Sequence, residues 1–259
     1  MRQYSVGVFL NIFDHNTLDW QQQMDFIKSL SGVEHIEVLL EYIPQTNSEK
    51  SLISTFLQSY KVIMHAPFMD ISLLSPHDEI VHASEKILAK TIDFAQKLSA
   101  QNLTIHADRY PNFWNSKMVK ERVLNSLERL SLQFTPRLCI ENLSYCGKTQ
   151  IAYPVMPDEI IALAQALSND IGITLDIGHL LKDGYKIYGL IEKLNRQIFD
   201  IHLHDGCKGS AHLALGHGDL DLRKLLLLLR KIKYRHFLTI EVVGQTQIRD
   251  SWNMLMKHI

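Results

Sequence analysis

Short apolar runs rich in β-branched residues alternate with longer segments of helical periodicity along the chain. The strand-like runs number eight: Tyr4–Leu10, His35–Leu40, Lys61–His65, Asn102–His106, Arg137–Glu141, Ile171–Asp176, Phe199–His204 and Phe237–Val242. The helix-like segments also number eight: Leu18–Ser31, Glu49–Tyr60, Asp78–Ala100, Ser116–Phe134, Pro157–Asn169, Ile187–Asn195, Leu220–Lys233 and Thr246–Lys257. Strands that alternate with helices form parallel sheets, and eight units in about 250 residues is the size of a (β/α)₈ barrel. We therefore expect one α/β TIM-barrel domain over residues 1–259.

A doubly wound open sheet is the competing architecture, but it normally has fewer units and a glycine-rich turn after its first strand. Here residues 11–13 (NIF) follow the first run, without a glycine. One helix start carries the expected chemistry, because Pro157–Glu159 places a proline and two acids in a first turn, where free backbone amides favour them. No linker or change of composition marks a second domain.

Composition narrows the class of protein. Lys and Arg number 27 against 28 Asp and Glu, a net charge of −1, which gives no general attraction for nucleic-acid phosphates. No run reaches the roughly 18 apolar residues that a membrane helix needs, and the N-terminus lacks the apolar core of a secretory signal. Three cysteines without CxxC spacing, Cys139, Cys146 and Cys207, suit a reducing compartment. We expect a cytoplasmic protein without membrane or nucleic-acid partners.

Ionisable residues gather at the ends of the strand-like runs. The ends carry His65, His106, Glu141, Asp176 followed by His179, His202 with His204, and Glu241, and the loop after the seventh run adds His212 and His217. In a (β/α)₈ barrel the C-terminal strand ends meet at the face that carries the active site. If these side chains crowd together at that face, their charges and hydrogen-bond donors lack partners unless a ligand binds there.

A divalent cation would match this set, because neutral imidazole and ionised carboxylate are natural ligands of Zn²⁺, Mn²⁺, Co²⁺ and Fe²⁺. Alternation along the strand points His202 and His204 inward, and the deeper His202 is the better ligand. His204 and Asp205 are candidates to orient a ligand or to contact substrate. The other six of the 13 histidines show no partners in the sequence and need no function: His15, His35, His77, His82, His236 and His258.

In this order the motifs HAPF, IHA, IEN, LDIGH, HLHD, HLALGHGDLD and IEV resemble the xylose isomerase-like TIM barrel superfamily, over roughly residues 65–243. That superfamily holds sugar and sugar-phosphate isomerases and epimerases together with phosphodiesterases related to endonuclease IV. The resemblance implies a four-ligand metal site at Glu141, Asp176, His202 and Glu241. Positions that complete a two- or three-metal cluster in the endonuclease-like members match His65, His106, His179 and His212. One position departs, because those members usually carry Asp where this chain has Ser210.

One metal would suit isomerisation or epimerisation of a sugar or sugar phosphate by proton transfer through a metal-stabilised enediolate. Glu141 and Glu241 would then move the proton, and His179 would position a hydroxyl. We favour this activity. A binding protein with a degenerate site is the least favoured class, because both carboxylates and the whole four-ligand set are present.

Two or three metals would instead suit phosphoester hydrolysis, by an abasic-site endonuclease or a small-molecule phosphodiesterase. His65, His106 and His212 would then be metal ligands. A DNA substrate is disfavoured by the near-zero charge and the short loops, since a lesion-binding enzyme needs phosphate contacts and residues that penetrate the duplex. This activity is the alternative.

Aromatic and basic residues follow the fourth run on the same face, at positions 109–110 (RY) and 113–114 (FW). They are more consistent with the wall of a small-molecule pocket than with stacking on a base, so the expected partner is a small carbohydrate. Barrels of this type often dimerise, and a homodimer is the other partner considered. The predicted substrate contacts are His204, Asp205, His217, Arg109 and Trp114.

Overall fold

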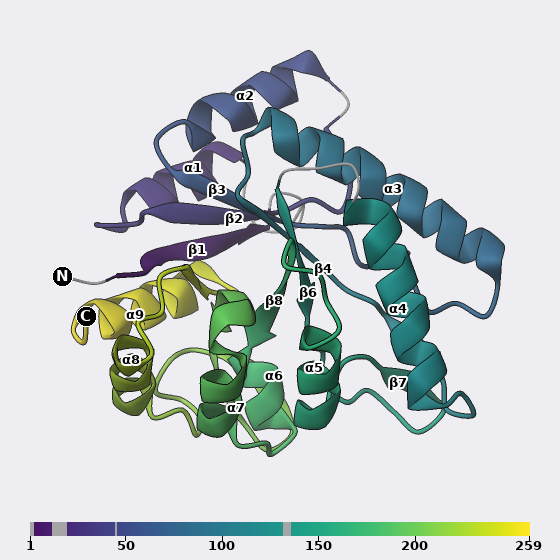
Figure 1. The fold of residues 1–259 in the computed structure, drawn as a ribbon. Helices are drawn as coiled ribbons and strands as arrows, with labels where there is room; N and C mark the ends of the chain where they lie inside the picture. The colour runs from purple at the N-terminus through teal and green to yellow at the C-terminus, as the bar shows by residue number, and fades with distance from the viewer. Residues whose placement is uncertain (1–2, 12–19, 45, 132–135) are drawn as a thin grey trace.

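Eight parallel strands close into a barrel in a computed structural model that describes residues 3–11, 20–44, 46–131 and 136–259 (Figure 1). The strands pair in the order of the chain, and the last closes on the first. Their bounds are β1 Ser5–Asn11, β2 His35–Leu39, β3 Lys61–His65, β4 Asn102–Ile105, β6 Arg137–Glu141, β8 Ile171–Asp176, β9 Ile198–Leu203 and β12 Phe237–Ile240. The predicted (β/α)₈ barrel is confirmed.

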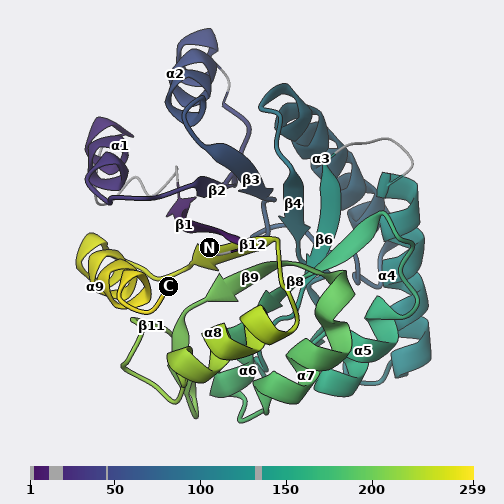
Figure 2. The ribbon, with the colours of Figure 1, turned by 60° about the vertical axis from the view of Figure 1, so that its left-hand side comes forward.

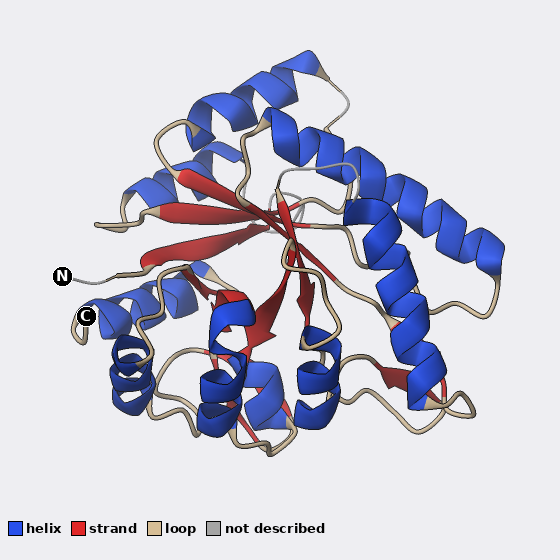
Figure 3. Cartoon of the chain, viewed as in Figure 1, coloured by secondary structure: helices blue, strands red, loops and turns tan. Residues whose placement is uncertain are grey.

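Helices surround the strands on the outside (Figure 3). Their bounds are α1 Trp20–Lys28, α2 Asn47–Leu57, α3 Asp78–Lys97, α4 Ser116–Ser131, α5 Pro157–Ala164, α6 Ile177–Lys182, α7 Ile187–Leu194, α8 Leu222–Lys231 and α9 Gln245–Met256, with a 3₁₀ turn at Asn195–Gln197. Two expected helix ends, residues 18–19 and 132–134, lie outside the described residues. Helix α9 lies beside β1 in Figure 1 and Figure 2 and completes the ring of helices. Trp252 of α9 donates its indole N–H to the carbonyl of Ser31 at 3.1 Å, which fastens that helix to the segment before β2.

Three features were not expected from the sequence. Helix α6 follows β8 directly, and its six residues are too short for a periodic pattern. Strand β5 (Arg109–Pro111) pairs antiparallel with β7 (Gln150–Ala152), and β10 (Asp205–Cys207) pairs antiparallel with β11 (Ser210–Leu213). The segment after β9 is therefore a small hairpin rather than an open loop.

The predicted start of α5 is confirmed. Pro157 occupies the first turn, and the Glu159 carboxylate accepts the backbone N–H of Val155 and of Met156, both at 3.0 Å. These amides have no partner inside the helix, so the carboxylate satisfies them. In the described part of the chain, no helix is long and apolar enough to cross a membrane.

The two faces of each strand differ in chemistry. In β2, Ile36 and Val38 belong to the hydrophobic core, whereas His35 and Glu37 are completely buried polar residues. Because side chains alternate along a strand, one set packs under the helices and the other fills the barrel. The interior is thus lined by polar groups along much of its length, including Thr104, Thr174 and Asp200 of neighbouring strands. These groups lead upward to the C-terminal mouth.

Candidate metal centre

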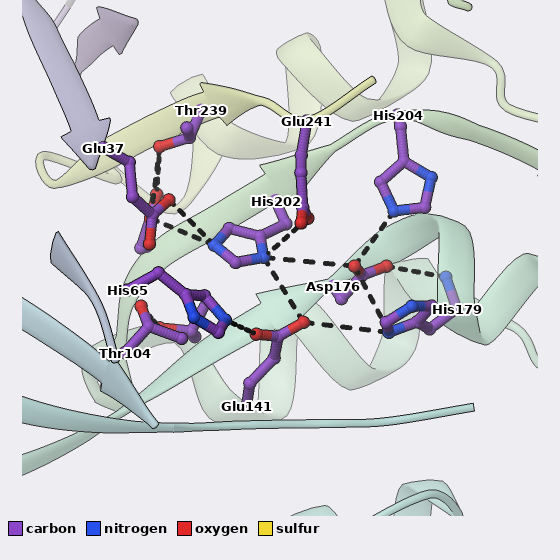
Figure 4. Close-up of polar contacts among 12 residues, drawn as sticks. Glu37, His65, Thr104, Glu141, Asp176, His179, His202, His204, Thr239 and Glu241 are labelled. Atoms are coloured by element: carbon purple, nitrogen blue, oxygen red, sulfur yellow. Dashed lines mark hydrogen bonds and ion pairs between the residues drawn. The ribbon is translucent and has the colours of Figure 1, made fainter. Parts of the chain in front are cut away.

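Four residues, here called the central group, meet at the C-terminal mouth: Glu141, Asp176, His202 and Glu241 (Figure 4). Each is supplied by the end of a different strand, β6, β8, β9 or β12. The His202 Nδ1 atom lies 2.9 Å from Glu241 Oε2, 3.3 Å from Glu141 Oε1 and 4.0 Å from Asp176 Oδ2. One ring nitrogen is thus faced by three carboxylates.

The central group has the properties of a cation site. Within the described segments, His202 Nδ1 and Glu241 Oε2 are buried atoms without a well-directed hydrogen bond, although they lie only 2.9 Å apart. Two ligands that are each about 2.1 Å from one cation lie roughly 3–3.5 Å apart. The distances of 2.9 Å to Glu241 Oε2 and 3.3 Å to Glu141 Oε1 are close to that range. A buried polar atom without a partner is costly, so these residues fit a bound divalent metal.

Charge in the central group is balanced by protons in the absence of a metal. Burial opposes ionisation of Glu141, but the neighbouring His202 and His106 outweigh it and hold the pKa of Glu141 well below its usual value. Burial also opposes a charge on His202, yet the carboxylates of Glu37, Glu241 and Glu141 raise the pKa of this ring well above its usual value. A cation would take over the role of the ring proton, so metal binding should release protons.

His202 is held from below by Glu37 and Asp200, two residues that were not expected from the sequence to belong to the site. Its Nε2–H donates to Glu37 Oε2 at 2.9 Å, which leaves Nδ1 directed to the carboxylates. Glu37 and Asp200 are both fully buried, and burial together with the charge of Glu37 raises the pKa of Asp200 well above its usual value. The signal was available: both acids interrupt apolar strands, and Asp200 shares the inward phase of His202.

The network continues downward through neutral groups. Thr239 donates its hydroxyl to Asp200 Oδ1 at 2.9 Å and lies 2.9 Å from His35 Nε2. His35 Nδ1 in turn lies 3.1 Å from the hydroxyl of Ser5. The consistent assignment is that His35 carries its proton on Nε2 and accepts from Ser5, and burial lowers the pKa of His35 to about 3. His35, which showed no partner in the sequence, is a buried structural residue.

A second group of potential ligands adjoins the central group through Glu141. Glu141 Oε2 lies 3.1 Å from His65 Nε2 and 2.9 Å from His106 Nε2, while Oε1 faces His202. The His65 ring donates from Nδ1 to the carbonyl of Ala66 at 2.8 Å, which turns Nε2 toward the carboxylate. The structure thus brings the predicted His65 and His106 together with Glu141, and that carboxylate stands between two groups.

A third group consists of His179, His204 and His212, which come from α6, the end of β9 and β11. His204 Nε2 donates to Asp176 Oδ2 at 2.9 Å. Its Nδ1 lies 3.2 Å from the carbonyl of Asp205, to which the protonated ring donates, and 2.9 Å from the backbone nitrogen of His212, from which the neutral ring accepts. Both nitrogens of His204 are therefore used, and the ring orients Asp176 rather than contacting substrate. Ser210, at the position that departs from the endonuclease-like pattern, is exposed.

Close packing maintains this orientation. At Gly178 an added Cβ would overlap the ring of His204, so only glycine fits between α6 and β9. Asn142 holds the end of β8, because its side chain accepts the N–H of Asp176 at 2.8 Å and donates to the carbonyl of the same residue at 3.0 Å. Asp176 is thereby fixed by Asn142 and His204, and its carboxylate also accepts the backbone N–H of His179 at 2.6 Å.

The remaining predicted substrate contacts are scattered. Asp205 is fully buried, and its carboxylate accepts the backbone N–H groups of Gly206, Gly216 and Leu220, so it anchors the loop that follows β11 instead of facing substrate. Trp114 packs against the core, with the Arg122 guanidinium 5.1 Å from its ring centre. His217 is exposed.

Arg109 does line a cavity of about 610 Å³ that opens beside the metal-ligand candidates. His106 and His179 form part of its wall, so the cavity reaches the second and third groups. Phe68 and Tyr145 contribute aromatic surface, and Lys182 adds a second cation. A cavity of this size accommodates a small organic molecule.

A barrel with carboxylates and imidazoles gathered at its C-terminal mouth defines a class of proteins built to act at that face. Residues 24–258 match the family described as Xylose isomerase-like TIM barrel, and the chain belongs to that family. The uncharacterized protein MJ1311 of Methanocaldococcus jannaschii is 26% identical over 203 residues, which cover 74% of this chain and 66% of that protein.

Solved structures share the fold at low sequence identity. A D-tagatose 3-epimerase-like protein superposes with a TM-score of 0.82 at 18% identity, covering 98% of this chain and 96% of its own. D-psicose 3-epimerase from Clostridium cellulolyticum gives 0.74 at 14% identity, with 95% and 89% covered. Endonuclease IV from Thermus thermophilus gives 0.71 at 19% identity, with 98% of both chains covered. These likenesses establish the fold and leave the reaction to the site.

Proposed function

We propose that the protein is a divalent-metal-dependent isomerase or epimerase of a sugar or sugar phosphate. The observation that carries the proposal is the central group, in which Glu141 and Glu241 converge on the orphaned Nδ1 of His202 from different strands. The many sugar epimerases among the structural neighbours support it. A divalent cation held by this group would bind the carbonyl and adjacent hydroxyl oxygens of the substrate and stabilise the enediolate charge.

The two glutamates differ in ways that suggest separate tasks. The Glu241 side chain is 15% exposed and that of Glu141 only 2% exposed, so Glu241 is the more accessible base. Glu241 would remove the proton from the carbon next to the carbonyl, and Glu141 would return one from the other side. His179, 13% exposed at the cavity wall, would accept a hydrogen bond from a substrate hydroxyl at Nε2, because its Nδ1–H donates to the carbonyl of Asn142 at 3.1 Å.

The test is solvent exchange at carbon. Mn²⁺-loaded protein is incubated in D₂O with ketoses and their phosphate esters, and NMR is used to look for deuterium at the carbon beside the carbonyl. We expect deuterium incorporation, lost by about a factor of 100 or more in Glu241→Gln. Glu192→Gln, at an exposed acid paired with Lys231, is the matched control. Full exchange in Glu241→Gln would refute the proposed mechanism.

A second candidate, phosphoester hydrolysis, is favoured by one observation: the two oxygens of Glu141 face different groups, as in a carboxylate that bridges two metals. Metal stoichiometry separates the two functions. The isomerase predicts about one tightly bound ion per chain, unchanged in His106→Ala. Two or three ions, with fewer in His106→Ala, together with cleavage of bis(p-nitrophenyl) phosphate, would establish the hydrolase instead.

A further inference from the structure

The cavity beside the metal-ligand candidates carries two cations on its wall. Lys182 is the last residue of α6, and Arg109 is the first residue of β5. In the described ranges, neither has a carboxylate within 4.0 Å, and Lys182 instead donates from Nζ to the Ser144 hydroxyl at 2.9 Å. Both cations are therefore available to a ligand.

The acids near these cations do not neutralise them. Asp183, the chain neighbour of Lys182, accepts the backbone N–H of Tyr145 at 2.7 Å and so is directed to the loop after β6. Asp108 also lines the cavity and is the one carboxylate among the described lining residues. Two cations against one acid leave the wall with an excess positive charge when the histidines are neutral.

The excess charge distinguishes between substrates. A neutral sugar gains no ionic attraction from fixed cations. A phosphate ester offers charged oxygens, which Arg binds with two parallel hydrogen bonds and Lys binds as a point charge. Phe68 and Tyr145 provide apolar surface next to the cations, against which the carbon chain of a sugar can pack. The same cavity reaches His106 and His179, so one molecule can contact the two cations and also these histidines of the second and third groups.

We propose that the substrate is a phosphorylated sugar whose phosphate lies between Lys182 and Arg109 while its hydroxy-carbonyl end points to the central group. This inference rests on the proposed function and adds the identity of the charged group. It assigns Lys182 and Arg109 as residues that determine specificity.

The experiment is a paired binding measurement on Mn²⁺-loaded protein by isothermal titration calorimetry. D-fructose 6-phosphate is compared with D-fructose, and D-ribulose 5-phosphate with D-ribulose. In at least one pair we expect the phosphate ester to bind about tenfold or more tightly than the neutral sugar, since hydrogen bonds to charged groups have this strength. The preference should fall severalfold in Lys182→Met or Arg109→Met and disappear in the double variant.

Lys186→Met is the matched control, because Lys186 is exposed on the segment between α6 and α7 and is not part of the cavity wall. It should retain the preference. Equal affinities within both pairs, no binding of either phosphate, or an unchanged preference in the double variant would overturn the inference. Tight binding of D-glucuronate without binding of the phosphates would also overturn it and assign the cavity to carboxylates.

The two proposals fail separately. Phosphate-selective binding without deuterium exchange would retain the phosphate subsite and reject the isomerase. Exchange with equal affinity for both members of each pair would retain the isomerase and reject the subsite.

Discussion

The two nitrogens of His202 face two differently built regions of the barrel. Below the ring, Nε2 donates a well-directed hydrogen bond to Glu37, and Asp200, Thr239 and His35 continue a chain of short contacts. Above the ring, Nδ1 meets three carboxylates and has no well-directed partner among the described residues. The lower region supports the ring, whereas the upper region leaves it poised for a ligand.

This difference shows how the barrel prepares a metal site without a metal. The buried hydrogen bond on Nε2 fixes the tautomer and the plane of the His202 ring, so Nδ1 points to the carboxylates of the central group. The carboxylates are held independently, as Asp176 is by Asn142 and His204. The convergence is therefore imposed by the fold rather than by the ion.

Removing a member of the upper region should have the largest effect. Glu141→Gln weakens its contacts to His65, His106 and His202 together. We expect Mn²⁺ affinity to fall by more than the roughly 100-fold seen for residues that only support a ligand. Metal content after dialysis and the metal-induced rise in Tm measure the change, with Glu192→Gln as control. An unaltered rise in Tm would show that Glu141 is not a ligand.

Altering the lower region should have a smaller effect. Glu37→Gln keeps the size of the side chain but removes the charge that orients His202 Nε2–H. We expect Mn²⁺ affinity to fall by about 10- to 100-fold while the circular dichroism spectrum of the fold stays the same. Affinity equal to wild type would mean that the ring is oriented by packing alone, and the contrast between the two regions would disappear.

The smallest expected effect is the dependence of folding stability on pH. Burial, with a contribution from Lys61, lowers the pKa of His35 to about 3, below the ordinary 6.5, so folding favours its neutral form. Its contribution to stability is present above pH 6.5 and is lost as pH falls toward 3. His204 is opposite: burial disfavours its charge, but Asp176 raises the pKa of the ring to about 9, so its contribution is present below pH 6.5 and lost as pH rises through 9.

His35→Gln isolates the first of these two terms. Gln can still bond to Ser5 and Thr239, but it does not titrate. Between pH 7.5 and 5.5, metal-free wild type should lose about 1.4 kcal/mol more free energy of unfolding than the variant. Urea unfolding at the two pH values measures it. Equal losses in both proteins would show that His35 is not held neutral by the fold.

Much of the upper region was predictable from the sequence because its members end strands. Parallel strands in a closed barrel bring their C-terminal ends together, so the acids and histidines at the strand ends could be placed at one mouth without coordinates. The selection of Glu141, Asp176, His202 and Glu241 as one ligand set came from the resemblance to the xylose isomerase-like superfamily. The same rule placed His65 and His106 at this mouth, and the structure brings both beside Glu141.

The lower region was missed because Glu37 and Asp200 lie inside strands rather than at their ends. Side chains alternate along a strand, so the position of each acid relative to the inward-facing residues of its strand would have placed it under His202. Asp205 was assigned to substrate, but its carboxylate is saturated by three backbone N–H groups, a contact set that depends on the unexpected β10–β11 hairpin. A short hairpin of this kind depends on tertiary contacts and leaves no periodic pattern in the sequence.

The glycine at position 178 has a consequence for variation in this chain. An added Cβ there would displace His204, and His204 orients Asp176. In a random-mutagenesis screen, Gly178 should therefore tolerate as few replacements as the acids and histidines of the mouth, although it carries no reactive atom. Intolerance mapped residue by residue would thus outline the space that the side chains need as well as the chemistry they perform.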